Sequence, residues 1–131
     1  MQLSGSGNIH GDGNYTNDGK TDITISGSGN IKLGFHSFKN LELSIAGSGN
    51  MNLKNGTTHT IDAKVSGSGN IDCSGIASND VDAKISGSGN VKVFPKNSID
   101  AKISGSGNVY YRGNVSNISS KIAGSGKVIK I

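Results

Sequence analysis

A five-residue block, Ser-Gly-Ser-Gly-Asn, recurs along the whole chain and constrains the fold more than any other feature. Successive copies start 22, 20, 20, 20, 18 and 19 residues apart; two open with alanine, and the last ends in Lys127. The copies occupy residues 4–8, 26–30, 46–50, 66–70, 86–90, 104–108 and 123–127. Such near-constant spacing is typical of a solenoid, in which each repeat forms one coil. The glycines suit a tight corner, because glycine adopts positive φ at little cost.

Apolar and polar residues alternate on both sides of most blocks. The segments Ile61–Val65 and Ile99–Ile103 precede a block, and the shorter Ile71–Cys73 follows one. A period of two indicates strands with one buried face. The variable stretches that join them, such as 74–80 and 94–98, are predicted as loops.

These observations predict one all-β domain over residues 1–131. We expect a right-handed parallel β-helix of about six to seven coils, each of ~20 residues. A β-sandwich is the alternative fold. It would need antiparallel hairpins and would not require identical corners at constant spacing.

Composition limits the classes of function. Glycine supplies 21 of the 131 residues, and the net charge of +4 comes mostly from lysines spread along the chain, which does not favour a nucleic-acid partner. No apolar run is long enough to cross a membrane, so no membrane insertion is expected. The sequence opens without an export signal, so a surface or periplasmic location would require a signal that has been removed, and the cytoplasm stays open.

Stacked coils would align equivalent residues in columns. The corner asparagines form one column, interpreted as a structural ladder of amides, with a polar ligand track as the alternative. An acidic column and a lysine column run side by side on the long strands, and we expect them to compensate each other in solvent. These three columns are Asn8, Asn30, Asn50, Asn70, Asn90 and Asn108; Asp22, Glu42, Asp62, Asp82 and Asp100; and Lys64, Lys84, Lys102 and Lys121.

No catalytic, cofactor or metal site is predicted. The stretch 12–19 resembles an oxygen-rich calcium loop, but Asn17 stands where glycine is needed and Ile23 where the closing glutamate is needed, so a polar capping loop is favoured. Residues 123–127 lack the earlier glycine and the following Ser or Thr of a phosphate loop. Cys73, the single cysteine, is expected to be a reduced thiol in the core.

Irregular aromatic segments provide the candidate binding surface. In repeat proteins, insertions on one face often bind a partner. The alternative, which the sequence favours, is that most of these aromatics fill the core. The candidate residues are Phe35, His36, Phe38, Tyr110 and Arg112.

The whole chain resembles a known family. The Ser-Gly-Ser-Gly-Asn corners followed by Ile or Val, the Ile99–Ile103 strand, the segment Val109–Gly113 and the ending Ala123–Ile129 are similar to the head GIN domain of putative autotransporter adhesins, here in a repeat-only version. The resemblance implies a β-helical domain of exported bacterial envelope or surface proteins with an adhesion role. It brings no catalytic residues.

We therefore expect a non-enzymatic envelope or surface scaffold that binds a surface glycan or protein. The alternative is a structural subunit that forms filaments or homo-oligomers by stacking through its coil ends, where strand edges are unpaired. Lys127 and Lys130 would discourage stacking at the C-terminal end.

Overall fold

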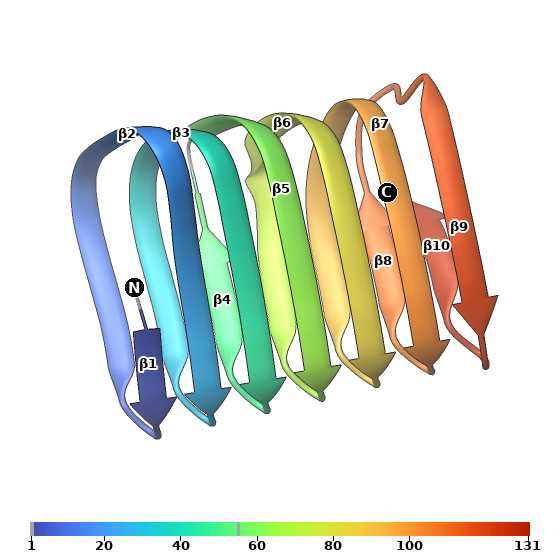
Figure 1. Ribbon diagram of the computed structural model, residues 1–131, viewed down its shortest axis with the longest axis horizontal. Coiled ribbons are helices and arrows are strands. Elements are labelled where there is room, and N and C mark those ends of the chain that lie inside the picture. Colours follow the sequence, from blue (N-terminus) through green and yellow to red (C-terminus); the bar gives the residue numbers. More distant parts are fainter. Residues whose placement is uncertain (1, 55) are drawn as a thin grey trace.

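The chain forms one continuous β-solenoid (Figure 1). The computed structural model describes residues 2–54 and 56–131, and their side chains except at 2–4, 9–21, 33 and 35–38. All strand pairs within this range are parallel, which excludes the β-sandwich, and the solenoid completes about five turns. The strands are β1 (Gln2–Gly5), β2 (Asn8–Gly27), β3 (Asn30–Gly47), β4 (Asn50–Leu53), β5 (Gly56–Gly67), β6 (Asn70–Gly87), β7 (Asn90–Gly105), β8 (Asn108–Tyr111), β9 (Asn117–Ala123) and β10 (Lys127–Lys130).

The predicted repeat sets the register between coils. Gly47 pairs with Gly67, Gly67 with Gly87 and Gly87 with Gly105, so equivalent residues of successive repeats lie directly opposite one another. Figure 1 shows the glycine corners aligned along one edge, where each long strand ends. Equivalent side chains therefore stack in files along the solenoid axis.

The stretches predicted as loops are largely strand. Strand β6 continues through 74–80 and β7 through 94–98. The expectation failed because backbone pairing between coils continues across these stretches although their side chains vary: Ala77 lies opposite Phe94, and Ser78 opposite Pro95. Register shifts on either side absorb the difference in length.

The core lies inside the coils and consists of the alternating apolar residues. Ile61, Ala63 and Val65 of β5 are buried, as are their counterparts in β6 and β7. Full burial of one isoleucine or valine side chain stabilises the fold by about 1.5–3 kcal/mol. The side chains of one core file become smaller along the axis: Leu43 in β3 is followed by alanine at 63, 83 and 101 in the next three coils.

The last coil is open at its outer side. Ile118 and Ile122 of β9 pair with the core residues Ile99 and Ile103, but they are 51% and 42% exposed. They hold core positions, but the described residues leave them exposed. The end expected to be protected by lysines therefore also presents apolar side chains.

The corner glycines have two different roles. Gly67, the first glycine of its block, has φ of +117°, which L side chains rarely adopt. Gly49, the second glycine of its block, is buried, and a Cβ there would lie 2.5 Å from the carbonyl oxygen of Gly29 and 2.6 Å from Ile25 Cγ2. Both glycines let neighbouring coils approach, because a Cβ at Gly67 would also lie 2.5 Å from the carbonyl oxygen of Gly47, and the first glycine additionally provides the positive φ of the turn.

Candidate functional site

The corner asparagines form a hydrogen-bonded ladder on the outer surface. Asn30 Nδ2 donates to Asn8 Oδ1 (3.1 Å), Asn50 Nδ2 to Asn30 Oδ1 (3.0 Å) and Asn70 Nδ2 to Asn50 Oδ1 (3.1 Å). The same bond lengthens to 3.3 Å and 3.4 Å at Asn90 and Asn108. The prediction of a structural ladder is confirmed.

The ladder ends at Lys127. In the later coils the backbone N–H also donates to the preceding amide oxygen, as from Asn90 to Asn70 and from Asn108 to Asn90 (both 3.1 Å). Lys127 N donates to Asn108 Oδ1 in the same way (3.1 Å). A lysine ammonium has no acceptor, so this side chain cannot extend the ladder.

A second polar column runs beside the ladder. It lies two residues after the asparagine in each repeat, on the same face of the sheet because side chains alternate. Pairing places Lys32 opposite Asn52, Asn52 opposite Asp72, Asp72 opposite Lys92, and Lys92 opposite Tyr110. The column therefore carries positive, amide, negative, positive and aromatic groups in turn.

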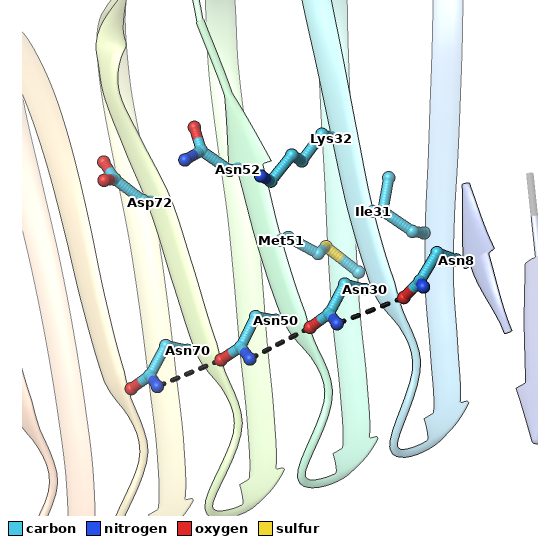
Figure 2. A pocket seen from close by; sticks show the side chains of 9 residues that line it. All are labelled: Asn8, Asn30, Ile31, Lys32, Asn50, Met51, Asn52, Asn70 and Asp72. Atoms are coloured by element: carbon cyan, nitrogen blue, oxygen red, sulfur yellow. Dashed lines mark hydrogen bonds between the residues drawn. The ribbon is translucent and has the colours of Figure 1, made fainter. Parts of the chain in front are cut away.

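The two columns bound a shallow groove. Its first part has a volume of about 560 Å³ and is lined by the ladder from Asn8 to Asn70 and by Lys32, Asn52 and Asp72 (Figure 2). Ile31 and Met51 lie between the columns, but their side chains are buried, so the strand backbone forms the floor there. A second part of about 530 Å³ shares Asn70 and Asp72 and continues to Tyr110 and Ile131.

The ladder leaves one N–H donor of each amide from Asn30 to Asn108 available to a ligand, whereas a spare acceptor remains only where the oxygen accepts a single bond, since the oxygens of Asn70 and Asn90 each accept two. A side-chain amide has two N–H donors and two acceptor lone pairs. Among the described residues, the amides of Asn30 and Asn50 each donate once and each oxygen accepts once. One donor and one acceptor therefore remain at each of these positions, and the ladder fixes their orientation.

The acidic and lysine columns lie on the long strands, as predicted. Asp62, Asp82 and Asp100 are in register, and so are the lysines from Lys64 to Lys121. Burial raises the pKa of Asp82, and the charges of Asp62 and Asp100 raise it further, whereas Lys84 and Lys102 lower it. One buried carboxylate oxygen of Asp62 and one of Asp82 have no hydrogen-bond partner among the described residues. The lysines therefore compensate this column only in part.

Metal-binding residues do not gather in the described part of the chain. No group of three His, Cys, Asp or Glu side chains there could hold a metal ion. The calcium-like stretch 12–19 lies outside the described side chains. Cys73 is fully buried, and this burial, with the charge of Asp72, raises the pKa of its thiol far above the usual range, so the predicted core thiol is confirmed.

The structure separates the residues predicted to form a binding surface. Tyr110 lines the groove, and the Arg112 guanidinium lies 4.8 Å from the centre of the Phe94 ring. The side chains of Phe35, His36 and Phe38 are outside those described. Their strand, β3, contains Lys32, which is four strand steps from Tyr110, or about 19 Å along the axis at ~4.8 Å per step. Ligand binding by these five residues stays a prediction.

Sequence reasoning missed the second column of the groove. Lys32, Asn52, Asp72 and Lys92 differ in charge and chemistry, so no repeated residue marks the position. The available signal was the polar residue found two places after each corner asparagine.

Comparison with known proteins identifies the family. Residues 1–115 match the family model described as "Putative auto-transporter adhesin, head GIN domain". The chain belongs to this family. No curated protein matches the sequence.

Solved structures of putative adhesins share the fold. A Bacteroides fragilis protein is 25% identical with a TM-score of 0.84, and the match covers 96% of this chain and 60% of that one. A Parabacteroides distasonis protein is 25% identical (TM-score 0.80; coverage 99% and 58%), and one from Parabacteroides merdae is 28% identical (0.77; 99% and 57%). This head GIN domain chain thus spans about 60% of the length of these proteins. Within its described residues, no helix has the length and apolar character of a membrane span.

Proposed function

We propose that this head GIN domain is a non-catalytic adhesion module on the bacterial surface, which binds a surface glycan or protein. The observation that carries the proposal is the continuous groove, whose lining groups recur at the interval of the coils. A repeated, orientationally fixed row of polar groups suits recognition of an extended partner, because little side-chain freedom is lost on binding. The family supports an adhesive role.

Cell adhesion tests this function directly. The whole chain is displayed on a non-adherent bacterium, and the cells retained under flow are counted on mucin, extracellular-matrix and bacterial cell-wall coatings. We expect retention several-fold above cells that display an unrelated β-solenoid on at least one coating. If these cells are retained no better than the control cells on every coating, the adhesive role is contradicted.

Self-association through the C-terminal coil is a second candidate function. It is favoured by Ile118 and Ile122, which are exposed at core positions beside the outer edge of β9. A second copy that covered this edge would bury both side chains and pair the strand. Light scattering should then show a dimer or larger species that the double variant Ile118→Ser/Ile122→Ser converts to a monomer. A wild-type monomer at high concentration would contradict it.

The winding of the solenoid, its number of coils and its location in the cell are also part of what we propose. A right-handed winding and a cell-surface or periplasmic location are what the repeat and the family lead us to expect. The count of six to seven coils, drawn from the seven glycine blocks, stays a prediction beside the about five turns of the solenoid. Detection of the chain on intact cells by antibody, compared with lysed cells, tests the location.

A further inference from the structure

The groove beside the asparagine ladder has the chemistry of a carbohydrate site. Sugar hydroxyl groups donate and accept hydrogen bonds at once, and a planar amide offers both functions side by side. Asn30 and Asn50 each keep one donor and one acceptor among the described contacts, and their orientation is fixed by the ladder. Because these side chains are already ordered before a ligand arrives, the entropic cost of ordering the protein on binding is low.

The second column supplies complementary groups across the groove. Asn52 lies half-exposed between Lys32 and Asp72, so neutral, cationic and anionic partners for hydroxyl groups stand on successive coils. Asp72 Oδ1 accepts bonds from Ser74 N (3.1 Å) and Ser74 Oγ (2.8 Å), which hold its carboxylate in place. Tyr110 adds an aromatic side chain in the second part of the groove.

The position of the groove argues against a peptide ligand. When an extended peptide binds a β-sheet by strand addition, it pairs with a free sheet edge, and its main-chain hydrogen bonds provide the affinity. Here the groove runs across the face of paired strands, whose backbone groups are already bonded to the neighbouring coils. The mixed charges of Lys32, Asp72 and Lys92 also do not favour a uniformly anionic polymer.

We infer that this groove binds an extended, neutral, hydroxyl-rich glycan along the solenoid axis, with one subsite for each coil. The inference rests on the adhesive function proposed above and names its site and ligand class. Successive subsites are ~4.8 Å apart, the separation of neighbouring strands. Six corner asparagines, from Asn8 to Asn108, set the length of the ladder.

Isothermal titration of the whole chain with neutral linear oligosaccharides of increasing length tests the inference. Probes are cello-, xylo-, manno- and chito-oligosaccharides, from disaccharide to octasaccharide. For at least one series, affinity should rise roughly two- to tenfold per added ring while subsites remain, as expected for about one net hydrogen bond each. The rise should level off near the hexasaccharide, because the ladder has six asparagines.

Matched variants locate the site without disrupting the ladder. Lys32→Ala, Asn52→Ala and Tyr110→Ala each remove a groove group outside the ladder and should weaken binding about three- to tenfold. Lys84→Ala makes the same change as Lys32→Ala on the long-strand face and should leave affinity unchanged. Thermal unfolding of each variant confirms that it is folded.

Several outcomes would overturn the inference. Heparin and unstructured peptides are titrated in parallel. The contradicting results are no binding by any neutral series, affinity that is equal for all lengths, equal effects of Lys32→Ala and Lys84→Ala, or binding only to heparin or to peptides. If cells displaying the chain adhere while one of these results is found, the adhesive function is supported and glycan binding in the groove is contradicted. If the oligosaccharides bind as expected but cells do not adhere, the groove stands and the adhesive function falls.

Discussion

The corner glycine Gly67 provides a sharp test of how the coils are stacked. Alanine at this position would have to adopt φ of +117°, and its Cβ would lie 2.5 Å from the carbonyl oxygen of Gly47 in the preceding coil. The backbone strain costs about 1–2 kcal/mol. Relief of the overlap by shifting one coil from the next costs a further ~1–3 kcal/mol. Gly67→Ala should therefore destabilise the protein by roughly 2–5 kcal/mol, a large part of a typical folding free energy.

Gly5→Ala is the matched control. Gly5 also has positive φ (+92°), but no described residue lies within 4 Å of the added Cβ. This variant should lose at most the ~1–2 kcal/mol of backbone strain. Urea unfolding followed by circular dichroism measures both, and at a slope of ~2 kcal/mol/M the Gly67→Ala midpoint should fall by about 1–2.5 M. Equal losses in the two variants would refute close stacking of the corners.

Two further variants and one labelling experiment test the charge column, the ladder and the core. The raised pKa of Asp82 means that the folded state binds extra protons, so its ionised form reduces stability above that pKa, and protonation as the pH falls removes the penalty. Asp82→Asn should thus raise stability at pH 7 by up to ~1 kcal/mol and by less at pH 4; a gain that is equal at both pH values would contradict this cause. Asn50→Ala breaks two ladder bonds and should cost about 1–3 kcal/mol in urea unfolding, whereas no loss would mean that the ladder adds nothing to stability. Cys73 should react with iodoacetamide only after unfolding, because the buried thiol is held protonated; mass spectrometry showing rapid native labelling would contradict its burial.

The coils and the core could be predicted from the sequence because both follow from periodicity. The spacing of the glycine blocks gave the register, and alternation in segments such as Ile61–Val65 gave the buried face, which the pairing and burial confirm. The strand character of 74–80 could not be predicted, since its pairing depends on backbone contacts with the next coil rather than on its own side chains.

The polar files outside the corner were harder to predict. Thr60 Oγ1 donates to Asn40 Oδ1 (2.7 Å), and Ser98 Oγ donates to Asp80 Oδ1 (2.6 Å). These four residues are in register and form a further polar file, directly before alternating segments such as Ile61–Val65. Its members differ in residue type, as do those of the groove column from Lys32 to Tyr110. Only the register between coils shows that these residues stand in one file. The groove lies in the space between two such files. The spacing of residues along the sequence does not show that this space exists.

Nuclear magnetic resonance of the isotope-labelled chain tests the central claim most directly. The protein is titrated with millimolar neutral hexasaccharides, and the shifts of asparagine side-chain amides are followed. Recognition along the ladder predicts that the Nδ2 resonances of Asn30, Asn50 and Asn70 move together with the backbone amides of Lys32 and Asn52. Shifts confined to the lysine face from Lys64 to Lys121, or no shift along the ladder, would contradict it.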